Sequence, residues 1–302
     1  MGGSDLEEHM ADMAGAVGER WVVPAPTGRS AGDHVCWPFR DRGELAAVAR
    51  AFVAEGLGRD ERVAYIGQGR PRELRDDLAG LANLQDCLDR GQLQVADIAA
   101  MPASDPAADP VDELHYLAAM TQDSINAGYT GLRIVANGTL RVLNPRRRDR
   151  IVRYEHLIDR FCLDHAFTRL CAFDTTALGA DVLAELGCVH TLTYGELSSF
   201  VLCAARGVDA ALVGSVDAFS IGQLLQALGR IGVPRAGGRA VLDAADLEFI
   251  DVRALRDLDG RVADAGATLM LRSPPIFVSR LMELLGVRAV RVEPAEPPER
   301  PV

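Results

Sequence analysis

Lysine is missing from this 302-residue chain, so all 32 basic residues are arginine. Acidic residues outnumber them and give a net charge of −11, which argues against a nucleic-acid-binding surface. Long apolar runs are also missing, and no stretch approaches the ~18 residues of a membrane-spanning helix. The acidic first residues, MGGSDLEEHMADMAG, lack the apolar core of a signal peptide, so we expect a cytoplasmic protein without membrane contact.

Closely spaced cysteine pairs are absent as well. The six cysteines include no C-x-x-C pair, which argues against a disulfide framework and against a finger-type zinc site. The phosphate-binding motif G-x-x-x-x-G-K-[ST] is also missing, so there is neither a glycine cradle nor a phosphate-binding lysine. We expect reduced and mostly buried thiols at Cys36, Cys87, Cys162, Cys171, Cys188 and Cys203.

What the sequence does contain is a repeated alternation of strand-like and helix-like segments. It predicts a mostly parallel sheet with helices on both faces, which binds ligands at the carboxyl ends of its strands. We assign 32–196 to this α/β domain and 1–31, which is punctuated by Pro and Gly, to a flexible arm. Predicted strands occupy 33–39, 62–67, 92–96, 132–136, 170–173 and 190–194, and predicted helices 41–56, 72–84, 112–127, 144–163 and 178–186.

A second, smaller α/β pattern follows. A predicted hairpin, 200–204 with 210–213, precedes a helix capped by Ser220. The stretch Val241–Leu255 then brings an apolar run to Asp251, a preferred helix N-cap residue. With the strand and helix signals that follow, we assign 199–293 to this second domain and the proline-rich 294–302 to a disordered tail.

The stretch VLDAADLEFIDVRAL resembles the centre of STAS domains, the sulfate transporter and anti-sigma factor antagonist family. The step from Gly214 to Asp217 and the late segment LMLRSPPIFVSRLMELLGV are similar to that family in the same order. The resemblance implies signal transduction by protein–protein interaction with an anti-sigma factor or a sensor kinase, in transcription regulation and stress response. The implied docking residues are Gly214, Asp217, Ser220, Asp251, Val252, Arg253 and Leu255.

Val252 occupies the position where phosphorylated members of that family carry a Ser or Thr. Because valine has no hydroxyl group, the resemblance implies no phosphoacceptor here, so the domain would be constitutively competent or controlled by another input. Asp217 and Asp251 also have a simpler interpretation as a turn residue and a helix cap.

The first domain resembles the MEDS domain in four segments: GDHVCWPF, AEGLGRDERVAYIG, LRIVAN and LCAFD. MEDS is the sensory domain of methanogen and methylotroph regulators, including the dichloromethane-responsive repressor. The resemblance implies a RecA-like fold that senses small molecules and has lost nucleotide chemistry. The missing phosphate-binding motif agrees with that loss.

His34 and Cys36 are the sharpest feature of that resemblance. They lie two residues apart on a predicted strand, so both side chains face the same side. The pair could hold a soft metal ion or a haem, or His34 could lower the pKa of the Cys36 thiol. The alternative is a polar pair in which Cys36 is simply buried. We predict a sensory ligand site, at the carboxyl edge of the sheet, from His34, Cys36, Trp37, Asn137, Cys171 and His190.

These patterns together favour a non-catalytic, two-domain cytoplasmic regulator. The first domain would detect a small ligand or a redox signal, and the second would bind a protein partner. We expect no cofactor, although a metal- or haem-binding redox sensor built on His34 and Cys36 is an alternative. A RecA-like nucleotide-binding enzyme is a second alternative, but the chain lacks the phosphate-binding lysine that such an enzyme would need. The sequence leaves homo-oligomerisation open.

Overall fold

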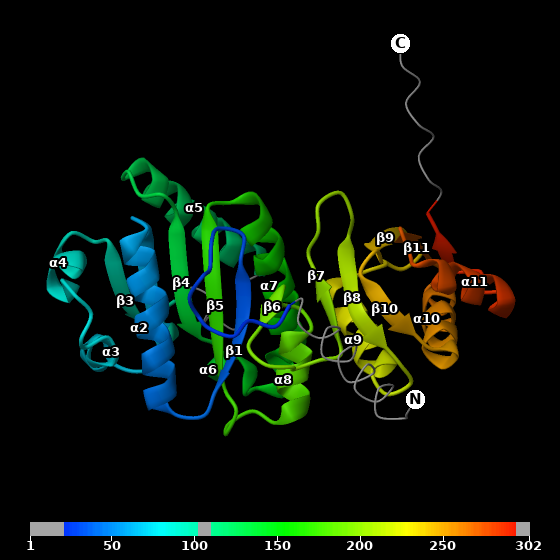
Figure 1. Ribbon diagram of the computed structural model, residues 1–302, viewed down its shortest axis with the longest axis horizontal. Coiled ribbons are helices and arrows are strands. Elements are labelled where there is room, and N and C mark those ends of the chain that lie inside the picture. Colours follow the sequence, from blue (N-terminus) through cyan, green and yellow to red (C-terminus); the bar gives the residue numbers. More distant parts are fainter. Residues whose placement is uncertain (1–20, 102–109, 294–302) are drawn as a thin grey trace, which may run out of the picture. The chain divides into compact units, whose positions relative to one another are not determined.

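Two compact units make up the computed structural model, Met1–Ser198 and Ser199–Val302, and the structure describes residues 21–101 and 110–293 (Figure 1). Most of the predicted N-terminal arm and the predicted tail lie outside the described residues. No helix in the described part of the chain is long and apolar enough to cross a membrane.

The first unit is built on a six-stranded sheet in the order β3-β2-β4-β5-β1-β6, and every neighbouring pair runs parallel. Parallel neighbours need helical crossovers, which is what the predicted alternation of strands and helices supplies. The strands are β1 (His34–Phe39), β2 (Arg62–Gly67), β3 (Leu93–Asp97), β4 (Leu132–Asn137), β5 (Phe167–Asp174) and β6 (Leu192–Thr193).

Helices cover both faces of this sheet, and a separate apolar core lies under each layer (Figure 1). One core contains Phe52 of α2 and Leu74 of α3, and the other contains Leu117 of α5 and Ile158 of α7. The predicted fold class is therefore confirmed. The helices are α2 (Arg42–Gly58), α3 (Pro71–Asp77), α4 (Leu84–Asp89), η1 (Ile98–Ala100), α5 (Pro110–Asn126), α6 (Thr139–Val142), α7 (Pro145–Asp164) and α8 (Ala180–Gly187).

The segment 21–31 does not form the free arm that its prolines and glycines suggested. Trp21 and Val23 are buried, at 7 % and 5 % exposure. Val22 forms a parallel bridge with Thr193 of β6, and the Val23 N–H donates to the Thr193 carbonyl at 2.8 Å. Apolar anchors inside a proline-rich stretch thus fix it to the edge of the sheet.

The predicted helix at 72–84 is too long, because α3 ends at Asp77 and α4 begins only at Leu84. Between these two helices, Gly80 takes a φ of +92° and Asn83 a φ of +56°. Both values lie in the left-handed region that glycine and asparagine adopt most readily. On α5, the apolar Ile125 is 40 % exposed while Glu113 is buried.

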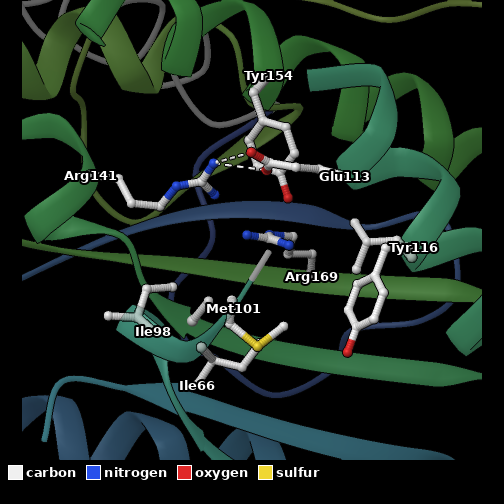
Figure 2. A pocket seen from close by; sticks show the side chains of 10 residues that line it. Ile66, Ile98, Met101, Glu113, Tyr116, Arg141, Tyr154 and Arg169 are labelled. Carbon is white, nitrogen blue, oxygen red and sulfur yellow. Dashed lines mark hydrogen bonds and ion pairs between the residues drawn. The ribbon is translucent and has the colours of Figure 1, made fainter. Parts of the chain in front are cut away.

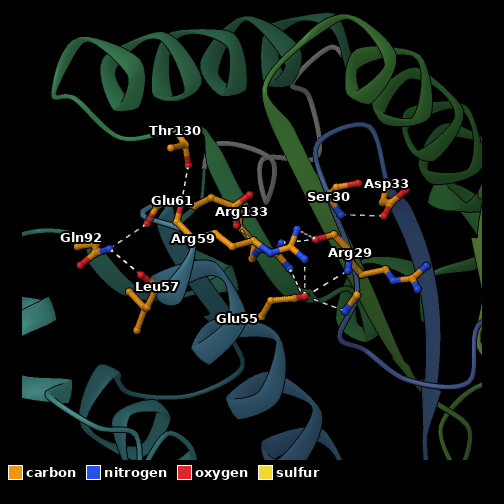
Figure 3. Close-up of polar contacts among 11 residues, drawn as sticks. Arg29, Ser30, Asp33, Glu55, Leu57, Arg59, Glu61, Gln92, Thr130 and Arg133 are labelled. Atoms are coloured by element: carbon orange, nitrogen blue, oxygen red, sulfur yellow. Dashed lines mark hydrogen bonds and ion pairs between the residues drawn. The ribbon is translucent and has the colours of Figure 1, made fainter.

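A fully buried arginine, Arg133 of β4, joins several elements of the first unit near the start of the strands (Figure 3). Its guanidinium donates to the carboxylates of Glu61 and Glu55 and to the Arg29 carbonyl. The same group lies over the Phe52 ring, 4.5 Å from the ring centre. A buried cation is tolerated only when it is paired in this way.

The second unit holds a six-stranded sheet with the order β10-β8-β9-β11-β12, and β7 pairs antiparallel with β8 as the predicted hairpin. The other strand pairs are parallel. Its strands are β7 (Phe200–Cys203), β8 (Ala210–Val216), β9 (Arg239–Asp243), β10 (Leu247–Ile250), β11 (Thr268–Arg272) and β12 (Val290–Val292). Its helices are α9 (Ile221–Ile231), α10 (Val252–Asp264) and α11 (Ile276–Leu285).

The central stretch Val241–Leu255 contributes two strands to this sheet, β9 and β10, although the sequence suggested a single strand that ends at Asp251. The Asp243 carboxylate accepts a hydrogen bond from the Ala245 N–H at 3.0 Å and so closes a tight turn between β9 and β10. Asp251 then caps α10 as predicted, since its carboxylate accepts from the Ala254 N–H at 2.6 Å.

Candidate functional site

Four ionisable side chains from distant parts of the first unit meet between the sheet and α7. His34 comes from β1, Glu155 from α7 and Cys171 from β5, and His190 follows α8. Each is at most 2 % exposed. Their potential ligand atoms all lie within 4.8 Å of one another. We call these four residues the buried cluster.

The polar atoms of the buried cluster lie close to one another. The Glu155 Oε2 atom lies 3.4 Å from His34 Nε2 and 3.8 Å from His190 Nε2. The Cys171 Sγ atom lies 3.5 Å from His34 Nε2 and 3.3 Å from Glu155 Oε2. The two imidazole rings stack with their centres 4.0 Å apart. Two nitrogens, one sulfur and one carboxylate oxygen therefore face a common point.

A second layer of polar groups orients the buried cluster. Asp159, one helical turn beyond Glu155, lies with its Oδ1 atom 3.2 Å from His34 Nδ1. The same oxygen accepts hydrogen bonds from the Thr191 N–H and hydroxyl. On the other side, Arg169 donates from Nε to Cys171 Sγ at 3.1 Å. The four central side chains are thus held in place from several elements.

Opposing electrostatic effects set the charges in the buried cluster. Burial raises the pKa of the Cys171 thiol, but the Arg169 cation and the two neighbouring histidines outweigh it and lower that pKa to about 6. Burial lowers the pKa of His34, yet hydrogen bonds to Asp159, Cys171 and Glu155 leave it well above its ordinary value. Burial raises the pKa of Glu155, whereas the His34 hydrogen bond and the nearby cations hold it well below its ordinary value.

Three of the six predicted ligand residues meet in the buried cluster: His34, Cys171 and His190. Cys36 lies beside Cys171 in the register of β1 and β5, and burial raises its pKa well above the ordinary value. Trp37 points to the opposite face of the sheet, where it stacks on Tyr194 at 3.9 Å.

The predicted position at the carboxyl edge is wrong for His34 and Cys36. They belong to the first half of β1, and that edge begins at Phe39. Whether these residues bind a ligand stays a prediction.

Sequence reasoning missed Glu155, Asp159 and Arg169. The signal for the first two was present, because carboxylates four residues apart share one face of a helix. On α7 they share that face with Ile158 and Cys162, so the acidic pair interrupts an apolar stripe. An arginine within a strand gave no such signal.

The carboxyl edge of the sheet carries a different feature, a cavity of about 320 Å³. Its walls come from the ends of β1, β2, β4 and β5, where parallel α/β sheets bind their ligands. Asn137 lies here, away from the buried cluster, and its Oδ1 accepts from the Thr139 N–H at 3.1 Å. The lining residues are Phe39, Arg42, Leu45, Tyr65, Gln68, Leu74, Asp77, Asn137, Thr139, Leu140, Leu143, Asp174 and Ala177.

A hydrogen-bonded trio lies on one wall of this cavity. The Tyr65 hydroxyl donates to Asp77 at 3.0 Å, and Arg42 donates to the other oxygen of the same carboxylate at 2.8 Å. Burial, together with the Asp77 charge and its hydrogen bond, raises the pKa of Tyr65. The trio supplies fixed polar groups beside the apolar side chains of the cavity.

We expect a Tyr65→Phe variant to change the alkaline stability of the first unit. A raised folded-state pKa contributes stability that is present below the unfolded value of ~10 and is lost as the pH rises through the folded value. The phenylalanine variant has no hydroxyl group that could contribute this stability. Its free energy of unfolding should therefore be ~1 kcal/mol below that of wild type at pH 8, and the two values should converge near pH 11. Urea unfolding followed by tryptophan fluorescence measures this, because both tryptophans, Trp21 and Trp37, lie in the first unit. If the free energies of unfolding of variant and wild type differ by the same amount at every pH, the result would contradict this role of Tyr65.

A second, smaller pocket of about 20 Å³ lies on the opposite face of the sheet and is large enough for about one water molecule (Figure 2). Arg141 bridges both oxygens of Glu113 there, at 2.8 and 3.0 Å. Arg169 lines this pocket and also contacts Cys171, so the pocket borders the buried cluster. Its size leaves the larger cavity as the candidate for an organic ligand.

In the second unit, the predicted docking residues surround the start of α9 and α10. The Asp251 carboxylate joins the two loops, because its other oxygen accepts from the Ala218 N–H at 2.9 Å. Between them Phe219 is 95 % exposed, and Val252 is 44 % exposed beside Asp251. Arg253 is exposed as well.

Two of the predicted docking residues are buried, and the predicted side-chain cap of α9 also needs correction. Leu255 is fully buried and packs inside the unit, so it offers no surface to a partner. Gly214 is buried within β8, where its φ of +92° requires glycine. Ser220 does not cap α9 with its hydroxyl, which instead bonds to Asp217 at 3.0 Å.

The first unit is a parallel α/β domain with helices on both faces and a cavity at its carboxyl edge. The profile of the MEDS family, the methanogen/methylotroph DcmR sensory domain, matches residues 33–191, more than half of the chain. The chain therefore belongs to the MEDS family, which indicates a regulatory sensor role. Comparison with curated proteins finds no match. The match ends before the second unit, so the STAS resemblance of that unit stays a prediction.

Proposed function

We propose that this protein is a non-catalytic signalling protein whose MEDS unit binds a small organic molecule in the cavity at the carboxyl edge of its sheet. One observation carries the proposal: a sensory family match coincides with a cavity where this class of sheet binds ligands. At about 320 Å³ the cavity lies near the lower end of the ~300–1,000 Å³ usual for ligand pockets.

The lining defines the chemistry of the proposed ligand. Leucines and Phe39 provide apolar walls, whereas the amides of Gln68 and Asn137 provide polar groups at one end. Arg42 is already paired with Asp77, so this pair adds no net charge to the wall. A small molecule with an apolar body and one polar group complements such a lining.

The second unit would report the state of the sensor by binding a protein. Its resemblance to STAS domains, together with the exposed Phe219 and Val252, supports an anti-sigma factor or a sensor kinase as the partner. Since Val252 has no hydroxyl group to phosphorylate, the MEDS unit would supply the control. The proposal places this regulation in the cytoplasm and includes no reaction.

A nucleotide-binding enzyme is the second candidate, because the cavity lies at the edge where nucleotides bind in related sheets. Phosphate recognition would need a glycine cradle with a lysine, and the chain has no lysine. A thermal-shift series with ATP and Mg²⁺ separates the two candidates.

We expect members of a panel of small amphiphilic compounds to raise the unfolding midpoint of the first unit, whereas ATP leaves it unchanged. A ligand at 100 times its Kd stabilises a protein by ~2.7 kcal/mol. Asn137→Leu should weaken binding about tenfold, because it removes one hydrogen bond of ~1.4 kcal/mol.

Leu284→Ala serves as the control for this experiment, since Leu284 is 84 % exposed and belongs to the second unit. It should leave the ligand response unchanged. A shift with ATP, or a response that Asn137→Leu does not alter, would refute the proposed pocket.

A further inference from the structure

We propose that the buried cluster is a four-coordinate zinc site, with His34 Nε2, Glu155 Oε2, Cys171 Sγ and His190 Nε2 as ligands. The inference does not depend on the ligand cavity, which lies at another part of the sheet. Neither the family match nor the STAS resemblance assigns these residues to a metal. One sulfur, two imidazoles and one carboxylate form a donor set that Zn²⁺ accepts.

The hydrogen bonds of the two histidines leave both Nε2 atoms directed at the cluster. The His190 Nδ1 atom lies 2.8 Å from the Leu186 carbonyl, which can only accept, so Nδ1 carries the proton. The His34 Nδ1 atom faces the Asp159 carboxylate, which already accepts from Thr191. In the neutral rings both Nε2 lone pairs therefore point toward a carboxylate and a thiol.

His190 Nε2 is the clearest sign that a cation belongs there. It is fully buried and has no hydrogen-bond partner. The nearest carboxylate oxygen, from Glu155, lies 3.8 Å away. With its Nδ1 protonated, His190 turns an Nε2 lone pair toward the Glu155 carboxylate, which is also an acceptor, and this is unfavourable out of contact with water unless a proton or a metal cation lies between them. A metal ion would satisfy His190 and the three other ligand atoms at once.

The spacing of the ligand atoms fits a tetrahedron around zinc. Zn–N and Zn–O bonds of ~2.0–2.1 Å and a Zn–S bond of ~2.3 Å give edges of ~3.4 Å between N or O atoms and ~3.6 Å to sulfur. The structure has 3.4 Å from His34 Nε2 to Glu155 Oε2 and 3.5 Å from His34 Nε2 to Cys171 Sγ. Glu155 Oε2 lies 3.3 Å from Cys171 Sγ and 3.8 Å from His190 Nε2, and all four ligand atoms lie within 4.8 Å of one another.

The surroundings of the buried cluster match those of a structural zinc ion. The carboxylate of Asp159 behind His34, and the Leu186 carbonyl behind His190, are the partners that orient metal-bound histidines. Four protein ligands close the coordination sphere, so no position is left for a substrate. The ligand atoms lie within 4.8 Å of one another, a spacing that suits one metal ion and leaves no room for a porphyrin.

Without a metal, the same residues would have to rely on protons. His34 as an imidazolium would pair with Glu155 and Asp159, and Cys171 would pair with Arg169. On zinc binding, any proton on His34 Nε2 or on the Cys171 sulfur leaves to solvent. The experiment must therefore separate a metal-bound cluster from a purely ionic one.

The test uses the full chain, expressed with Zn²⁺ or with Co²⁺ in the medium, because the cluster is buried and is expected to load during folding. We expect one metal ion per chain by mass spectrometry. X-ray absorption of the zinc form should show one sulfur at ~2.3 Å and three N or O ligands at ~2.0–2.1 Å. The Co²⁺ form should show a sulfur-to-cobalt charge-transfer band and the intense visible bands of tetrahedral Co²⁺.

Matched cysteine variants identify the ligand. Cys171→Ser should abolish the charge-transfer band, whereas Cys36→Ser, the neighbouring buried thiol, should retain it. Asp159→Asn should weaken metal binding by ~10–100-fold while it keeps all four ligands. Wild-type protein without metal, a zinc shell with more than one sulfur, or a band lost only in Cys36→Ser would each overturn the proposal. None of these results depends on a bound organic ligand or on a partner, so they leave the proposed function to its own test.

Discussion

Replacing Arg133 by methionine should destabilise the first unit by ~3–5 kcal/mol, because the change leaves buried carboxylates without their cation. Arg133 is fully buried, and Glu61, one of its partners, is 7 % exposed. The variant also removes the hydrogen bond that holds the Arg29 carbonyl. Urea unfolding followed by tryptophan fluorescence measures the loss for this unit alone, since both tryptophans lie in it.

Two further variants show whether charge pairing is the cause. Arg133→Met combined with Glu61→Met removes both charges, and it should restore much of the lost stability. Arg59→Ala breaks a pair with Glu55 in which the arginine side chain is 42 % exposed, so it should cost less than ~1 kcal/mol. If the double variant is no more stable than Arg133→Met, the arginine acts through packing and not through its charge.

Val252→Asp should reduce partner binding by the second unit about tenfold or more, which corresponds to ~1.4 kcal/mol. The new carboxylate would lie beside Asp251, on the surface that includes Phe219. A negative charge in the first turn of α10 favours the helix dipole, so the variant should fold at least as well as wild type. Pull-down of the proposed partner, an anti-sigma factor or a sensor kinase, by the full chain, with its dissociation constant, gives the measurement.

Leu284→Asp introduces the same charge on an exposed position of α11 and serves as the matched control. It should leave partner binding within about twofold of wild type, because Leu284 lies on a different helix from the proposed docking residues and an exposed charge is screened by solvent and salt. A Val252→Asp protein that binds as tightly as wild type would place the docking surface elsewhere. Val252→Ser tests the related expectation that a hydroxyl at this position restores phosphorylation by a cognate kinase.

Most strands of the sheet could be predicted because their apolar runs are short and bounded by turn residues. LRIVAN and RVAYIG became β4 and β2 almost residue for residue. The break between α3 and α4 could not be predicted, because the leucine spacing of 72–84 continues through the left-handed turn at Asn83. Helical periodicity reports which face is apolar, and it does not report where the backbone turns.

The buried cluster was predictable only in part, for a related reason. Period-two alternation correctly places His34 and Cys36 on one face of β1. The depth of that face, and the carboxylates of α7 that cover it, depend on how the helix packs. From the sequence alone a charged residue such as Glu155 is expected to be exposed, although here it is only 2 % exposed.

Two neighbouring strands belong to both candidate sites of the first unit. Strand β1 carries His34 of the buried cluster near its start and Phe39 of the cavity at its end, and β5 carries Cys171 and Asp174 in the same way. The cavity and the cluster therefore lie at different positions along the same pair of hydrogen-bonded strands. A ligand that displaces Phe39 acts on the same rigid element that positions His34. Any influence of an occupied cavity on the affinity of the cluster must then be matched by an equal influence in the reverse direction.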